Sequence, residues 1–119
     1  MNKWILMAGI LFFSPLMAQA ACSSSDFKVD SFKVDLNPIK GTLQMKGNLI
    51  NNCSEPGAAQ LLIEAKDSAG NVVQDRKLWP AGTSNIAPGD KASFDAGRMF
   101  RYRETMQTYS ISVVDVRTW

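Results

Sequence analysis

The sequence predicts an all-β domain built as an antiparallel sandwich of about seven short strands. Apolar and polar residues alternate in residues 42–49, 61–66 and 108–113, and a period of two is typical of strands that bury one face. Turn-forming residues such as those at 80–82 and 88–90 separate the strand segments. The 119 residues have room for one small domain. This combination is typical of an immunoglobulin-like fold.

The N-terminus predicts a secretory signal peptide. Lys3 gives a positive start, residues 4–13 form an apolar run, and Ala18-Gln19-Ala20 is a small-x-small processing site. A permanent anchor needs roughly 20 apolar residues, so this run is too short to be one. We therefore expect residues 1–20 to be removed and residues 21–119 to form the exported domain. The short leader favours the periplasm of a bacterial envelope, or secretion.

Cys22 and Cys53 are the two cysteines of the chain. In an oxidising compartment an even pair in a small domain favours a disulfide, and the spacing does not fit a Cys-x-x-Cys redox motif. The alternative is lipidation of Cys22, because Ala20-Ala21-Cys22 resembles the end of a lipoprotein box. Gln19 stands where that box prefers an aliphatic residue, and lipidation would leave Cys53 unpaired. The disulfide is therefore the favoured interpretation.

Irregularities are expected in the first and last strands. Residues 27–31 and 32–36 are near-copies, FKVDS and FKVDL, and a five-residue step moves the apolar side chains to the other face. This pattern predicts a bulge or bend near Asp30 and Ser31, where the strand would cross between sheets. Val114 breaks the alternation of the last strand and predicts a second bulge. A helix is possible only within residues 97–106.

Residues 41–94 combine a strand ending in Asn, a strand ending in Asp-x-x-Gly, and a Pro-Gly turn before an apolar strand. The residues that carry this pattern are Gly41, Leu43, Gly47, Leu49, Asn51, Ile63, Asp67, Gly70, Val72, Val73, Ile86, Pro88, Gly89 and Phe94. The pattern resembles the FxLYD-type family of small extracytoplasmic immunoglobulin-like domains. At the four positions of the family name this chain has Ile63, Ala65, Lys66 and Asp67, so the Asp alone matches. The resemblance implies a binding or structural module, and it carries over no catalytic residue.

The densest basic and aromatic stretch lies at residues 98–103. Arg98, Arg101 and Arg103 are interleaved with Phe100 and Tyr102. On an extended strand the last two arginines share one face and the two rings share the other. The guanidinium groups can then bind a carboxylate or a phosphate. The alternative is a charged edge strand that prevents sheet-to-sheet aggregation.

Tryptophan supplies a further candidate contact. Trp79 precedes Pro80, and Trp119 is the last residue of the sequence. Aromatic anchors dominate many interfaces, although both rings can instead cap the open end of a small sandwich. The candidate binding patch is Trp79, Arg98, Arg101, Tyr102 and Arg103.

The composition argues against several function classes. The chain has no His, which removes the commonest general base and metal ligand, and we expect no catalytic residues, metal site or cofactor. Loss of Lys3 from the 13 basic residues leaves 12 against 11 acidic ones, a net charge of +1. Such a balance is not typical of a nucleic-acid binder.

We therefore expect an exported, non-catalytic binding or structural module of the bacterial envelope, which recognises a protein or an acidic polymer. It has no predicted transmembrane segment. One alternative is a small periplasmic copper carrier that uses Met45, Met99 and Met106, or an enzyme; Met45 also fits a role as core filler. Another is a pilus-like assembly subunit. The sequence leaves the oligomeric state open.

Overall fold

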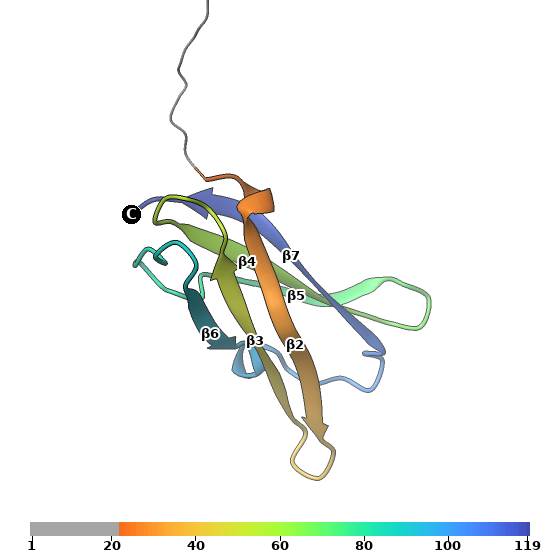
Figure 1. The fold of residues 1–119 in the computed structure, drawn as a ribbon. Helices are drawn as coiled ribbons and strands as arrows, with labels where there is room; N and C mark the ends of the chain where they lie inside the picture. The colour runs from red at the N-terminus through yellow and green to blue at the C-terminus, as the bar shows by residue number, and fades with distance from the viewer. Residues whose placement is uncertain (1–21) are drawn as a thin grey trace, which may run out of the picture.

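Two antiparallel sheets of three strands each make up most of residues 22–119, the part of the chain that the computed structural model describes (Figure 1). One sheet has the order β2-β3-β6 and the other β5-β4-β7. The all-β prediction is confirmed. The elements are η3 (Ser24–Asp26), β2 (Phe27–Asn37), β3 (Thr42–Asn51), β4 (Ala58–Lys66), β5 (Val72–Leu78), β6 (Lys91–Asp95), η4 (Gly97–Met99) and β7 (Thr108–Arg117).

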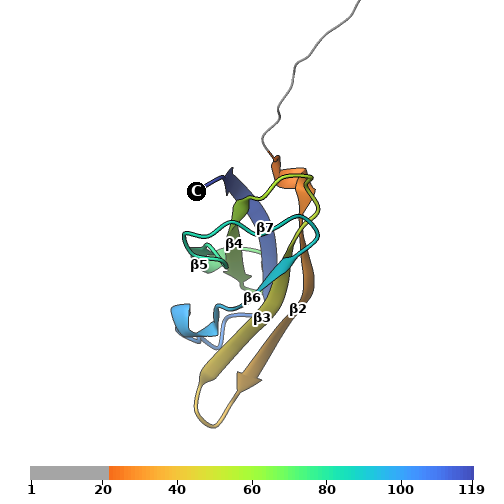
Figure 2. The same cartoon turned by 60° about the vertical axis from the view of Figure 1, so that its left-hand side comes forward.

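The two sheets face each other (Figure 2), and the two central strands, β3 and β4, supply half of the buried residues of the hydrophobic core. Alternate residues of both strands are buried, as the period of two predicts. Met45 and Leu49 of β3, and Leu61 and Ile63 of β4, have no exposed surface. Met45 is therefore part of the core, as expected for a core filler.

The predicted bulge in the first strand is confirmed. The register of β2 on β3 shifts between Asp30 and Lys33, and Ser31 has a positive φ of 58°. Phe32 lies at this bulge and stacks on Phe94 of β6 with ring centroids 6.4 Å apart. The expected crossing between sheets is wrong, because β2 pairs with β3 on both sides of the bulge. The extra residue at the bulge lets the side chains before and after it point to the same face of one sheet.

Gly47 makes room for this aromatic stack. It is paired with Phe94 on the neighbouring strand, and a Cβ at Gly47 would lie 2.8 Å from the Phe94 ring. Real Cβ atoms do not approach a ring so closely, so a side chain here would displace Phe94. The glycine therefore has a packing role in the middle of a strand, where it is otherwise unfavourable.

The bulge predicted in the last strand is also confirmed. Leu61 pairs with Val113 and Gln60 pairs with Asp115, so Val114 is an extra residue in β7. The possible helix within residues 97–106 is limited to the three residues of η4. Gly97 packs so closely on β3 that a Cβ would lie 2.0 Å from the Leu43 carbonyl oxygen. This contact fixes where the arginine-rich segment begins.

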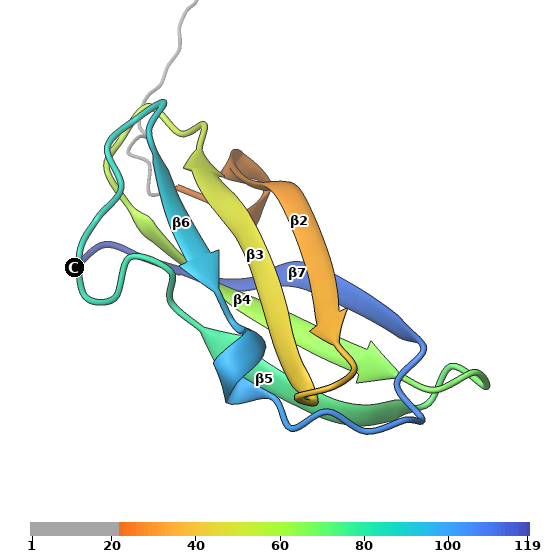
Figure 3. The ribbon, with the colours of Figure 1, turned by 90° about the horizontal axis from the view of Figure 1, so that it is seen from below.

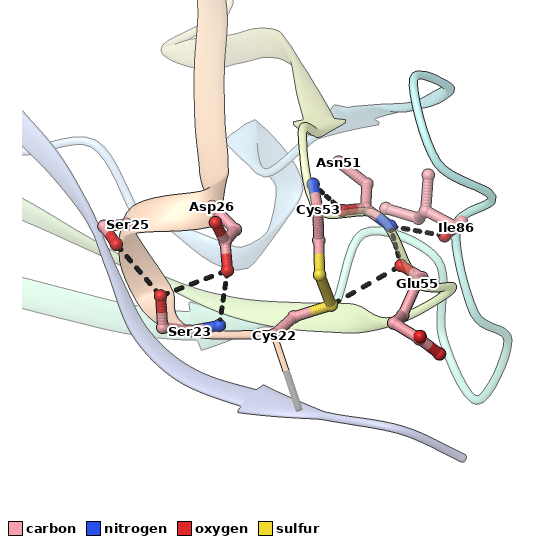
Figure 4. Close-up of a disulfide and its surroundings, with 8 residues drawn as sticks. All are labelled: Cys22, Ser23, Ser25, Asp26, Asn51, Cys53, Glu55 and Ile86. Atoms are coloured by element: carbon pink, nitrogen blue, oxygen red, sulfur yellow. Dashed lines mark hydrogen bonds between the residues drawn. A yellow bond between two sulfur atoms is a disulfide. The ribbon is translucent and has the colours of Figure 1, made fainter. Parts of the chain in front are cut away.

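A disulfide between Cys22 and Cys53 ties the residues before η3 to the loop after β3 (Figure 4). The predicted pairing is confirmed, and the sulfur of Cys22 is not free for lipid attachment. Residues 1–20, the predicted signal peptide, lie outside the described residues. Within residues 22–119 no helix is long and apolar enough to cross a membrane.

Candidate binding surface

The arginine-rich segment is not a strand. Arg98 lies in η4, and residues 100–107 form an irregular connection to β7. Both strand-based interpretations of residues 98–103, alternating faces and a charged edge strand, are therefore wrong. The reason is the turn of η4 against β3, since the amide of Ala96 donates a hydrogen bond to the Met45 carbonyl at 2.9 Å. The chain leaves this turn beside β5.

Side chains of β5 hold the segment in place. The Gln74 amide group donates from Nε2 to the Arg101 carbonyl at 3.0 Å and accepts from the Arg101 N–H at 2.8 Å. Arg76 Nε donates to the Met99 carbonyl at 3.0 Å, and its guanidinium group lies 5.9 Å from the centre of the Phe100 ring. The edge of β5 is therefore covered through side-chain contacts, not by a further strand.

These contacts create a surface hollow of about 490 Å³ that we call the arginine hollow. Three arginines line it, and no Asp or Glu side chain does. The positive charges are therefore not neutralised within the hollow. Its lining residues are Val73, Gln74, Arg76, Arg101, Arg103 and Thr105.

A second hollow of about 380 Å³ adjoins the first, and Arg101 lines both. Arg98 and Tyr102 are part of its lining, together with Phe100 and Gly97. The structure thus brings Arg98, Arg101, Tyr102 and Arg103 onto one continuous surface.

Burial raises the pKa of Tyr109, the second residue of β7, above its ordinary value, and the neighbouring Tyr102 phenol raises it further. Tyr109 therefore stays protonated and neutral across the physiological pH range. It adds no negative charge beside Tyr102.

Trp79 does not join this surface. Its ring packs edge-on against Trp119 with centroids 5.5 Å apart, and the Arg117 guanidinium lies 5.5 Å from the Trp79 ring and 4.8 Å from the Trp119 ring. Asn85 holds the Trp119 backbone, accepting from its N–H at 2.9 Å and donating to its carbonyl at 3.3 Å. These contacts agree with the alternative interpretation, in which the two tryptophan rings cap one end of the fold.

Arg76 is the member of the site that the sequence reasoning missed. It belongs to β5, VVQDRKL, whose four central residues are all polar and give no sign that one of them has a special role. Its partners Met99 and Phe100 lie more than twenty residues further along the chain. No local pattern signals a contact of this range.

Metal ligands are not grouped in the described part of the chain. Residues 22–119 contain no set of three or more His, Cys, Asp or Glu side chains placed to hold a metal ion. Among the candidate thioether ligands, Met45 and Met106 are buried in the core, whereas Met99 is 39% exposed. The methionines are therefore divided between core and surface.

No family model, curated protein or solved structure matches the chain. We therefore infer the function from the geometry of the arginine hollow and from the chemistry of its residues.

Proposed function

We propose that the protein is an exported, non-catalytic binding module of a bacterial envelope that recognises a carboxylate-bearing acidic polymer through the arginine hollow. The observation that carries this proposal is the convergence of Arg76, Arg101 and Arg103 on one hollow whose lining has no acidic side chain. Guanidinium groups match carboxylates with paired, charge-assisted hydrogen bonds.

The arrangement suits a polymer because it is partly ordered before binding. Arg76 is held by the Met99 carbonyl and lies beside the Phe100 ring, and the backbone of Arg101 is held by Gln74. Fixing these groups in advance reduces the entropy lost on binding. The second hollow, with Arg98 and Tyr102, continues the basic surface beyond the first. An extended chain of carboxylates can therefore contact both hollows at once.

The strand order supports an immunoglobulin-like fold as part of this proposal. In an immunoglobulin domain the first, second and fifth strands share one sheet, and the third and sixth share the other. Here β2, β3 and β6 lie together, as do β4 and β7. The fourth strand, β5, lies beside β4, in the position of the C′ strand of variable domains. Such folds commonly serve as binding modules.

Binding to polygalacturonate, a polymer of carboxylated sugars, tests the function, with neutral dextran as the control ligand. The double variant R101E/R103E removes two guanidinium groups from the hollow and reverses their charge. We expect it to lose affinity by about 100-fold or more, because each charge-assisted hydrogen bond contributes about 1.5–3 kcal/mol.

The matched control is K28E/K91E, which makes the same change in net charge at exposed lysines of β2 and β6. It should bind nearly as well as the wild type. Equal losses in both variants would show that net charge drives binding without the hollow. Binding that survives R101E/R103E, or binding of an acidic protein in place of the polymer, would also contradict the proposal.

A further inference from the structure

The outer edge of β7 is a second surface, independent of the arginine hollow. β7 pairs with β4 on one side, and within residues 22–119 no strand pairs with its other side. Figures 1 and 3 show the start of β7 lying apart from β2, the nearest edge strand of the other sheet. An immunoglobulin sandwich has a seventh strand at this place, beside the sixth. The start of this edge is therefore open where the fold class has a neighbour, whereas elsewhere β7 lies close to β2 and η3.

The other edge strands carry features that prevent strand addition. β6 has five residues and a charge at each end, Lys91 and Asp95. β5 has three consecutive charged residues and is covered by residues 99–101 through Gln74 and Arg76. β2 has a bulge at Ser31 and four charged residues, which are Lys28, Asp30, Lys33 and Asp35.

β7 lacks this protection over most of its length. Residues 108–114, TYSISVV, contain no charged residue, no Pro and no Gly. β-branched and aromatic residues dominate them, and these are the residue types that favour strands. Charge and a bulge occur only towards the C-terminal end, at Val114, Asp115 and Arg117. Such a segment at a free edge is a template for pairing with another strand.

The inward face of β7 is also incompletely covered. Tyr109, Ile111 and Val113 pair with β4 residues that are fully buried, yet they themselves are only half-buried. They are packed against the core, so their remaining exposure comes from the open side of the strand. A strand added at this edge would place its own side chains beside them and remove apolar surface from water.

We propose that the occupant of this edge is β7 of a second copy of the chain, paired antiparallel about a two-fold axis. Residues 108–114 are self-complementary because they bring no like charges into opposition across the ladder. The small net charge of the chain, +2 over the whole sequence, does not oppose association. The β5-β4-β7 sheets of the two copies then continue into one sheet, and the symmetric contact closes at two copies.

The association should be weak. A ladder of seven residues falls at the low end of specific interfaces, below about 1,200 Å² of total buried surface. We therefore expect a dissociation constant of about 1–100 μM, which corresponds to about −8 to −5.5 kcal/mol.

Sedimentation velocity over a concentration series tests this inference. The sample is the protein purified from cells that express the full chain. Ser112 is exposed and lies in the middle of the uncharged segment, so S112K places two lysines near the two-fold axis. The matched control is S93K, the same substitution at an exposed position of β6. We expect the wild type and S93K to form dimers as concentration rises, and S112K to remain monomeric with an unchanged circular dichroism spectrum.

Amide hydrogen exchange locates the contact independently of any substitution. In the wild type, exchange at residues 108–114 should slow as the protein becomes dimeric, and exchange on β6 should not change. A wild type that stays monomeric throughout the series would overturn the inference, as would a dimer that persists in S112K or open polymers in place of dimers. If exchange at residues 108–114 slowed only when a peptide was added, the inference would also be overturned, because the edge would then bind another partner. None of these results depends on polymer binding, so failure here leaves the proposed function standing.

Discussion

Replacement of Asn51 tests the packing around the disulfide most sharply. Asn51 is the last residue of β3, and its side chain has no exposed surface. Its Nδ2 donates to the carbonyls of Glu55 and Ile86 at 2.9 and 2.7 Å, and its Oδ1 accepts from the Cys53 N–H at 2.8 Å (Figure 4). One amide group therefore joins three loop positions.

N51L keeps the branched shape and the number of heavy atoms of the side chain, although its two methyl groups are larger than the amide oxygen and nitrogen, and it removes all three hydrogen bonds. The Ile86 carbonyl retains a hydrogen bond from the Gly57 N–H at 3.1 Å, so the main losses fall on Glu55 and Cys53. A buried polar group without a partner costs about 1–3 kcal/mol. Because the hydrogen bonds to Glu55 and Cys53 are only part-buried, we take the lower part of this range, about 1–2 kcal/mol each and about 2–4 kcal/mol for the two. For a domain of this size, 1 kcal/mol corresponds to about 4–8 °C in melting temperature. We expect N51L to melt at least about 8 °C below the wild type.

Thermal and urea unfolding of the oxidised protein measure this loss. The matched control is N52L, which makes the same substitution at the exposed neighbouring residue and should change stability by less than about 0.5 kcal/mol. If N51L is as stable as N52L, the three hydrogen bonds do not stabilise the loop, and the reasoning is refuted.

Two further predictions concern the stability of the fold. Removing the disulfide with C22S/C53S should lower the free energy of unfolding by about 3–4 kcal/mol, because the cross-link closes a long loop in the unfolded chain. Urea unfolding of the variant, and of the wild type with and without a reducing agent, measures this loss. A wild type whose stability does not change on reduction would contradict the prediction. For Asp95, burial raises the pKa, but the N–H groups of Met45 and Gly97 and the charges of Lys46 and Arg98 outweigh it and hold the pKa below its ordinary value. The carboxylate therefore contributes stability that is present above the unfolded pKa of about 3.9 and is lost as pH falls through the lower folded value. D95N should be less stable than the wild type at pH 7, and this difference in stability should shrink at about pH 3. The urea midpoints of both proteins at the two pH values measure the difference. A difference that stays constant would contradict the predicted link between stability and the Asp95 pKa.

The regular parts of the fold could be predicted because side-chain alternation has a period of two. A strand that must keep Phe27 and Phe32 on one face needs an extra residue, and the structure has it at Ser31. The break in alternation at Val114 likewise predicts the second bulge, which the structure has in β7. The disulfide followed from the number of cysteines and the expected compartment. These features depend on local sequence or on simple counting.

The candidate site could be predicted only in part. Arg101 and Arg103 stood out by their density in the sequence, but the strand assigned to them was wrong because the packing of Gly97 on Leu43 is a tertiary contact. The contribution of Arg76 depends on contacts with a segment more than twenty residues away. The sequence suggests that Trp79 belongs with the arginines, yet its ring lies against Trp119 and Arg117. Periodicity carries no information about which distant segments meet.

The mode of attachment of residues 99–101 explains why the arginine side chains are exposed. A Gln side-chain amide can both donate and accept hydrogen bonds, as a peptide group does, and Gln74 does both with the backbone of Arg101. The backbone is thus satisfied without a paired strand. The side chains of Arg101 and Arg103 remain exposed at the hollow, where they can contact a ligand.

A hydrogen-exchange footprint with polygalacturonate tests the central claim most directly. If the arginine hollow binds the polymer, exchange should slow at residues 73–76 and 98–105 and stay unchanged at the Trp79 and Trp119 end of the fold, and the effect should weaken as salt is added. Slowed exchange centred on the tryptophans or on the β2-β6 sheet, or no change at saturating polymer, would contradict the assignment of binding to this surface.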